Sequence, residues 1–170
     1  MKHLKTLLFA VVLCIGSTSF INAQSNVAHI DTQALIDAMP AAITAKAELE
    51  KLAKTYDADI RTMAKEYDNK LKQYDAEAST KTDEENAKRA QEVGEMQTSI
   101  QQYRGQAQQD LQKKEQELFE PIYNELKVAI QKVGKAQGFQ YILDSREGQG
   151  MLLMAEGKDL LADVKKELGF

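Results

Sequence analysis

The sequence lacks residues on which several kinds of protein depend. Its 170 residues include no tryptophan, two prolines and one cysteine. A single cysteine excludes a disulfide framework and a thiolate zinc site within the chain. The scarcity of proline, with long stretches rich in Ala, Glu, Lys and Gln, favours long helices over an ordinary globule.

A basic surface is also missing. The chain has 22 Lys and Arg against 26 Asp and Glu, a formal net charge of −4. Binding to nucleic acid depends mainly on neutralising phosphates with basic side chains. The composition therefore disfavours a nucleic-acid partner.

The N-terminus has the layout of a secretory signal peptide. Lys2, His3 and Lys5 precede an apolar run, residues 7–15, which is followed by small and polar residues. The run is shorter than the roughly 20 residues that span a bilayer. We expect residues 1–23 to be cleaved after Ala23 and the mature chain to be exported, the alternative being an uncleaved anchor.

The only cysteine, Cys14, lies within this apolar run. Leu13 precedes it, whereas a bacterial lipoprotein signal has a small residue at that position, so we expect no lipidation. Loss of Lys2 and Lys5 with the signal would change the formal charge from −4 to −6.

Residues 40–78 contain no glycine or proline after Pro40 and carry a regular apolar stripe. Its members are Leu49, Leu52, Tyr56, Ile60, Met63, Tyr67, Leu71 and Tyr74. Their spacing repeats every eleven residues, and about 3.67 residues per turn predicts a helix hairpin that is nearly straight or right-handed. Pro40 suits the first turn of this helix because its missing N–H is not needed there.

A second helix is predicted from a capping box, in which Thr82 is the N-cap and Glu85 lies three residues on. Its stripe comprises Val93, Met96, Ile100, Tyr103, Ala107 and Leu111, then Leu118, Ile122, Leu126, Ile130 and Val133. Pro121 should kink or divide this helix. Gly134 or Gly138 should end it.

The flanking segments predict a small head with three short strands. The strands are expected at residues 27–31, 139–144 and 151–154, with a helical turn at 32–39 and a last helix capped by Asp159. Gly148-Gln149-Gly150 is interpreted as a hairpin turn, since it lacks the context of a dinucleotide-binding loop.

These elements predict a mostly α fold with a small β head (α+β), in which an antiparallel two-helix hairpin projects as an arm. The expected division is a signal peptide at 1–23, a head formed by 24–39 and 121–170, and an arm at 40–120. At 1.5 Å per residue, a helix of about 38 residues is roughly 57 Å long. The end of the second helix has no arm partner and should pack on the head.

We expect self-association through the heads. A head of under about 70 residues rarely supplies more than about 3–5 kcal/mol from its core, and three short strands leave exposed edges. The expected head-core or oligomer-contact residues are Val27, Ile30, Phe139, Tyr141, Leu143, Leu152 and Met154. The number of copies does not follow from this reasoning.

No catalytic, cofactor or metal site is predicted. The acidic pairs lie among lysines on helical faces, and His29, the one histidine beyond the signal, suits a structural role in a strand. Arm side chains that could contact a binding partner are Tyr56, Met63, Tyr67, Tyr74, Met96 and Tyr103, because tyrosine and methionine adapt to varied surfaces. Packing between the two helices is the alternative role for the tyrosines.

Several motifs, in their order and spacing, resemble the Skp/OmpH-like periplasmic chaperone family over residues 27–168. The segment from Val27 to Ile36 is similar to the family's first strand and turn, and Pro40 and the long helix follow in family order. Residues 119–123, 139–144 and 158–168 resemble three further family segments, although Leu161 stands where the family usually has Thr.

The resemblance implies a homotrimer whose three arms enclose a cavity and hold unfolded outer-membrane proteins without ATP. It implies no catalytic residue. The best-known members have basic arms that attract these client proteins and lipopolysaccharide, whereas residues 41–120 here have a net charge of −4. We therefore expect client contact through apolar and tyrosine positions, and membrane contact stays open. The alternative function is a structural or adaptor coiled coil of the cell envelope.

Overall fold

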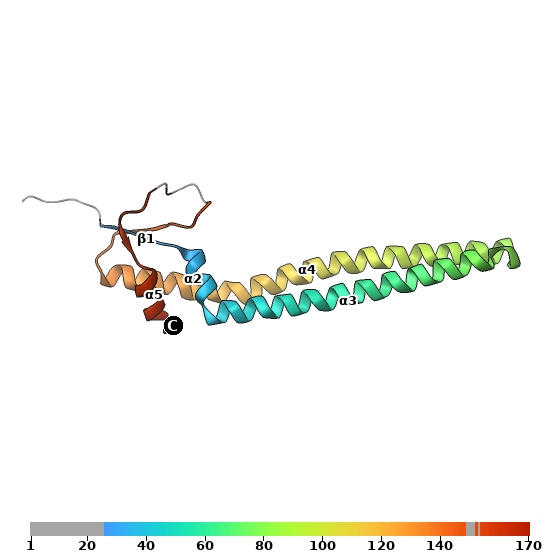
Figure 1. The fold of residues 1–170 in the computed structure, drawn as a ribbon, viewed down its shortest axis with the longest axis horizontal. Helices are drawn as coiled ribbons and strands as arrows, with labels where there is room; N and C mark the ends of the chain where they lie inside the picture. Colours follow the sequence, from blue (N-terminus) through green and yellow to red (C-terminus); the bar gives the residue numbers. More distant parts are fainter. Residues whose placement is uncertain (1–25, 149–151, 153) are drawn as a thin grey trace, which may run out of the picture.

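The fold is a long helical hairpin attached to a small α/β head (Figure 1). The computed structural model describes residues 26–148, 152 and 154–170. In order, the elements are β1 (Val27–Ile30), α2 (Thr32–Ala38), α3 (Pro40–Glu77), η1 (Ala78–Thr80), α4 (Asp83–Ala136), β2 (Tyr141–Asp144), β3 (Lys158–Asp159) and α5 (Leu161–Leu168). The predicted fold class is confirmed. The expected signal peptide and Cys14 lie outside the described residues.

The two arm helices begin where the sequence predicts. Pro40 occupies the first turn of α3, which continues for 38 residues. At the tip, η1 leads to the capping box of α4. The Thr82 hydroxyl accepts the Glu85 N–H at 3.2 Å, and the Glu85 carboxylate accepts the Thr82 N–H at 3.1 Å. These two N–H groups would otherwise be unpaired at the helix start.

The predicted stripes form the interface between α3 and α4, which lie side by side along the arm (Figure 1). Most stripe residues are half-buried, and Leu71 is 44% exposed. Between Leu49 and Leu118, only Ile100 and Ala107 are fully buried. The arm interface is therefore narrow and partly open to water. Among the described residues, no helix has the length and apolar character needed to cross a bilayer.

Helix α4 runs unbroken for 54 residues through Pro121, so the prediction that Pro121 divides it is wrong. Gly138, with a φ of 77°, follows the helix end and supplies the predicted stop. Gly134 lies inside α4 and serves another purpose. A Cβ there would overlap the Ile142 side chain of β2, so glycine permits the close approach of helix and strand.

Two other glycines of α4 have no packing role. Gly94 and Gly105 are exposed, and a Cβ added to either would meet no atom within 4 Å. Glycine within a helix costs about 0.5–1 kcal/mol relative to alanine. We predict that Gly94→Ala and Gly105→Ala each raise the free energy of unfolding by about that amount in urea denaturation. Gly134→Ala is the comparison, and it should give no such gain. A destabilising effect of Gly105→Ala would contradict this account of the arm.

The sheet has the order β2-β1-β3, and both pairings are parallel. The prediction of a strand at 151–154 is wrong for Leu152 and Met154, which are not in a strand. The other two residues of that segment, Met151 and Leu153, are not among the described residues. The third strand is instead β3, whose Asp159 pairs with His29. Strands β2 and β3 each pair with β1 and not with each other. Gln149 and Gly150 of the expected hairpin turn are not described.

The head core lies between one face of the sheet and the helices. Ala28 and Ile30 of β1 point into it, where Leu35, Leu160 and Val164 are fully buried. The head portion of α4 contributes Phe119, Ile122, Leu126, Ala129 and Val133. The end of α4 therefore packs on the head, as predicted. Asp159 is not the N-cap of α5, which is Leu160, but its carboxylate accepts the Leu161 N–H at 2.8 Å.

Asp144 joins the end of β2 to the start of α2. Its carboxylate accepts the Thr32 hydroxyl at 2.7 Å and the Thr32 and Arg146 N–H groups at 3.3 and 3.2 Å. Desolvation raises the pKa of Asp144, but these hydrogen bonds and the Arg146 charge outweigh it and hold the pKa below its ordinary value. Asp144 thus connects two segments that are far apart in sequence.

Candidate functional site

Two tyrosines at the middle of the arm form a reciprocal pair of cross-helix hydrogen bonds. Tyr56 of α3 donates to Asp110 of α4 at 2.9 Å, and Tyr103 of α4 donates to Asp59 of α3 at 2.7 Å. The two rings meet edge to face, with centroids 5.8 Å apart. These side chains fix the register of the two helices, although part of each ring remains exposed.

The hydrogen bonds to Asp110 and Asp59, together with desolvation, raise the pKa of Tyr56 and Tyr103. A phenol whose pKa is raised by folding stabilises the fold below its ordinary value of 10.0 and loses this effect as the pH rises through the raised pKa. The double change Tyr56→Phe/Tyr103→Phe should therefore lower the Tm at neutral pH and remove the late-ionising phenols from an ultraviolet pH titration. A titration curve whose part above pH 10.0 is the same in the wild type and the double variant would contradict the pairing.

Near the arm tip, Tyr74 is enclosed by charged partners. Its hydroxyl donates to Glu92 at 2.5 Å, and Lys70 pairs with the same carboxylate. The guanidinium of Arg89 lies 4.5 Å from the Tyr74 ring centroid and pairs with Glu77 at 2.6 Å. The phenol of Tyr74 is therefore committed to an interaction within the arm.

The two candidate methionines come together on the arm surface. Met63 of α3 and Met96 of α4 line one hollow of about 330 Å³, with Ile100 at its floor and Glu66, Glu92 and Glu95 around it. Tyr67 is half-buried in the α3 stripe. A shallow hollow with deformable methionines suits weak contact with varied apolar groups. Contact with a client at Met63, Met96 and the arm tyrosines stays a prediction.

The outer face of the sheet is apolar and uncovered by the described chain. Val27 and Tyr141 lie opposite each other in neighbouring strands, and Leu143 lies beside His29. Val27, Tyr141 and Leu143 are 39, 61 and 44% exposed. Of the other expected head residues, Ile30 is buried in the core, Phe139 packs against it, Leu152 is half-buried and Met154 is exposed. The predicted set therefore contains both core and surface residues.

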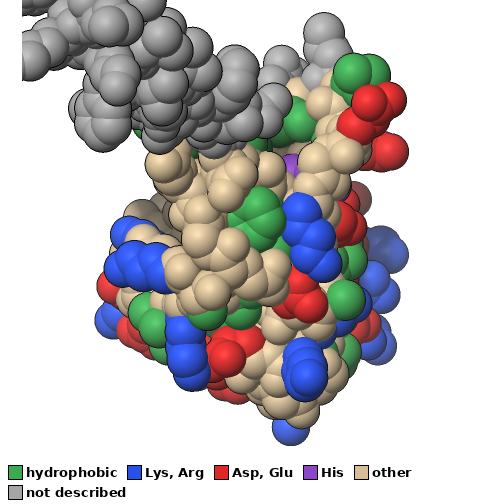
Figure 2. Space-filling model, turned by 90° about the vertical axis from the view of Figure 1, so that its left-hand side faces the viewer, with side chains coloured by type: hydrophobic (Ala, Val, Ile, Leu, Met, Phe, Trp, Pro, Cys, Tyr) green, Lys and Arg blue, Asp and Glu red, His purple; other side chains and the backbone are tan. Residues whose placement is uncertain are grey.

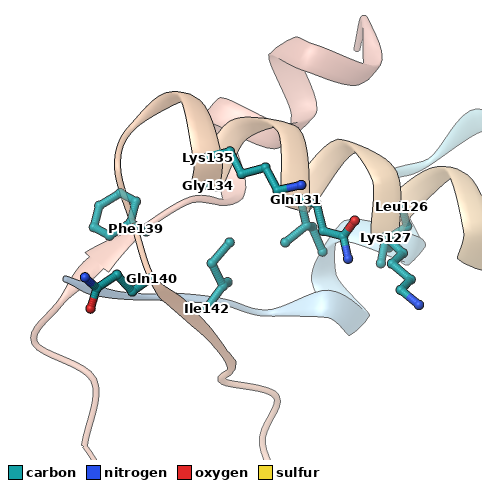
Figure 3. Close-up of a pocket in the computed structure, with 9 residues that line it drawn as sticks. Leu126, Lys127, Gln131, Gly134, Lys135, Phe139, Gln140 and Ile142 are labelled. Carbon is teal, nitrogen blue, oxygen red and sulfur yellow. The ribbon is translucent and has the colours of Figure 1, made fainter. Parts of the chain in front are cut away.

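A hollow of about 430 Å³ lies between α4 and the edge strand β2 (Figure 3). Ile142 points from β2 toward α4, where Gly134 makes room for it. The remaining lining is Leu126, Lys127, Ile130, Gln131, Lys135, Phe139 and Gln140. Its apolar floor adjoins the sheet edge and extends the uncovered surface of the head.

Charges on the head do not gather into a field of one sign over the face in Figure 2, where acidic and basic side chains are interspersed. Within the described residues, no cluster of three His, Cys, Asp or Glu could hold a metal ion. His29 lies 3.1 Å from the Ser145 hydroxyl and so has a structural partner.

The comparisons with known proteins agree with this architecture. A profile of the outer membrane protein (OmpH-like) family matches residues 26–168. A crystal structure described as an OmpH-like outer membrane chaperone, from Caulobacter crescentus CB15, matches with a TM-score of 0.73 and 20% identity over 86% of this chain and 85% of that chain. No functionally curated protein matches. At 20% identity the solved structure shows the shared fold. The family profile covers most of the sequence, and the chain belongs to the OmpH-like outer membrane protein family.

Proposed function

We propose that the protein is an ATP-independent periplasmic holdase, a chaperone that binds unfolded outer-membrane proteins and prevents their aggregation before membrane insertion. The observation that carries this proposal is the pairing of a long, partly open arm with an apolar sheet face, in a member of the OmpH-like family. No catalytic step is part of the proposed function.

The proposed assembly is a homotrimer joined through the heads. Parallel sheets in proteins are normally covered on both faces, whereas this one exposes Val27, Tyr141 and Leu143. A second and third copy would cover that face and the edge of β2. The number of three copies comes from the family resemblance. The open face of the sheet supports self-association but does not give the number of copies. The division into a head at 24–39 plus 121–170 and an arm at 40–120 is part of this proposal.

Arms projecting from a shared head would surround a client loosely. Residues 41–120 carry 13 basic and 17 acidic side chains, so long-range attraction of an acidic client is not the basis of binding. The half-buried tyrosines and the Met63–Met96 hollow offer many weak contacts instead. Weak and plural contacts permit release without ATP.

The rival function is a structural or adaptor coiled coil of the cell envelope that clamps one folded partner. Such a role favours a dry and continuous interface between the arm helices. Between Leu49 and Leu118 only Ile100 and Ala107 are fully buried, and polar cross-links such as Tyr56–Asp110 interrupt the apolar contacts. The arm therefore fits the holdase better than the clamp.

Light scattering tests the holdase directly. An outer-membrane β-barrel protein unfolded in urea is diluted into buffer with the purified protein, with an equal mass of serum albumin, or alone. We expect the protein to suppress aggregation near stoichiometric amounts without ATP, and albumin to have little effect. Scattering equal to that of the albumin sample would refute the proposed function.

A further inference from the structure

One exposed stripe of α4 has no charged member from Thr98 to Tyr123, although Arg104, Glu115 and Glu120 flank it. Positions three or four residues apart lie on one side of a helix, and a stripe with this spacing begins at Thr98 and ends at Tyr123. Its members are Thr98, Gln101, Gly105, Gln108, Gln112, Gln116, Phe119 and Tyr123. All except Phe119 are exposed. We call this set the amide stripe.

The amide stripe is distinct from the side of α4 that packs against α3. Ala107, which faces α3, is 4% exposed, and Gln108 is turned from it by about 100° because a helix has 3.6 residues per turn. The cross-helix partners Tyr103 and Asp110 also belong to the α3 side. The four glutamines therefore face away from the internal interface of the arm.

Other exposed parts of the arm are dominated by charge, as in the pairs Lys54–Glu50 and Arg61–Asp57 on α3. Removing a charged side chain from water costs much free energy unless the charge is paired. Removing a side-chain amide costs less. Each glutamine offers two N–H donors and one C=O acceptor. These are the groups needed to pair with the peptide groups of another chain, whatever its side chains.

The stripe ends at an aromatic hollow near the head. Gln112 and Gln116 lead into a space of about 500 Å³, lined also by Glu115, Glu120 and Asn124. Phe119 and Tyr123 meet there with ring centroids 5.8 Å apart, and Tyr123 is 52% exposed. The exposed Tyr123 ring, packed beside the buried Phe119, provides a place for an apolar or aromatic side chain to pack.

We propose that the amide stripe binds an extended segment of unfolded polypeptide through its peptide groups, with an apolar side chain of that segment in the Phe119–Tyr123 hollow. The inference rests on the proposed holdase function and names the surface and the chemistry by which it acts. From Thr98 to Tyr123 the stripe is about 37 Å long. At about 3.3 Å per residue, an extended segment of about 11 residues matches it.

This mode of binding is independent of client charge. It gives an acidic arm a way to hold acidic and basic segments alike, because neither the stripe nor the peptide group is ionised. Binding should therefore change little with ionic strength, and a charge of either sign placed on the stripe should weaken it.

The test measures affinity for a fluorescently labelled polypeptide that is permanently unfolded, reduced and carboxymethylated α-lactalbumin, by fluorescence anisotropy at low and high salt. The stripe variants are Gln108→Glu/Gln112→Glu and Gln108→Lys/Gln112→Lys. The controls place the same charges at Asn69 and Gln73 of α3, two exposed amide side chains that are also four residues apart but lie on the other helix. Circular dichroism melting verifies that every variant is folded.

Both stripe variants should bind about tenfold more weakly, as expected for loss of two hydrogen-bonding groups, and both control variants should bind as the wild type does. Equal affinities of stripe and control variants would overturn the proposal while leaving the holdase intact. Opposite effects of the Glu and Lys variants would also overturn it, since binding would then depend on charge. A wild-type protein that does not bind the polypeptide at all would refute the holdase itself.

Discussion

Replacing Tyr141 and Leu143 together by aspartate is expected to convert the assembled protein into folded monomers. Both side chains lie on the open face of the sheet, and in the single chain they are 61 and 44% exposed. The substitution therefore removes little from the protomer core. Full burial of such a side chain contributes about 1.5–3 kcal/mol, and burying an unpaired carboxylate opposes association further. Self-association should weaken by at least about 100-fold.

Sedimentation or light scattering with mass detection gives the oligomeric state, and circular dichroism shows whether the helices remain. Leu71→Asp is the matched control, because Leu71 is also 44% exposed but lies on the arm. It should leave the mass unchanged. A Tyr141→Asp/Leu143→Asp protein that keeps the wild-type mass would show that the heads do not associate through this face.

Replacing Asp144 by alanine should destabilise the head by about 2–3 kcal/mol, because hydrogen bonds to a charged group contribute about 1.5–3 kcal/mol. The carboxylate is 22% exposed and binds the Thr32 hydroxyl and N–H. Its removal leaves the first turn of α2 and the end of β2 without their connection. Urea denaturation measures the loss.

The same group predicts a dependence on pH. Hydrogen bonding keeps the pKa of Asp144 below its ordinary value of 3.8 despite desolvation. Its contribution is therefore present above pH 3.8 and is lost as the pH falls through the lowered pKa. The stability difference between wild type and Asp144→Ala should shrink on acidification through this range. Asp57→Ala, at an exposed ion pair, is the control and should change stability by less than about 0.5 kcal/mol at neutral pH. A difference that is constant with pH would contradict the role of the charge.

The sequence predicts the arm well because its signals are local. The α3 start at Pro40 and the Thr82–Glu85 capping box depend on residues within one helical turn. The apolar stripes follow from helical periodicity alone. Strands β1 and β2 are also short apolar runs, and both are predicted to within two residues at either end.

The missed features depend on contacts between distant segments. Strand β3 consists of Lys158 and Asp159, neither of which favours a strand, and it exists through its pairing with Ala28 and His29. By composition, the apolar residues 151–154 favour a strand more than the two residues of β3 do. Parallel pairing requires a connection longer than a tight turn, and the whole arm lies between β1 and β2 in the sequence.

The hydrogen-bond partners of the arm tyrosines could not be predicted from the sequence for the same reason. Their place on the stripes is evident from the sequence, but the carboxylate that each phenol binds depends on the register of α3 against α4. Nothing local marks Asp59 or Asp110 among the many acidic residues of the arm. The amide stripe, in contrast, is readable once α4 is known to be one unbroken helix, since only then do Thr98 and Tyr123 share a face.

Native mass spectrometry of the protein, alone and after dilution of an unfolded outer-membrane β-barrel protein into it, tests the central claim most directly. It reports the number of assembled chains and the capture of a client in one measurement. We predict a species of three chains alone, and three chains with one client after mixing, without ATP. A single chain in both samples, or a trimer that never carries client, would contradict the account.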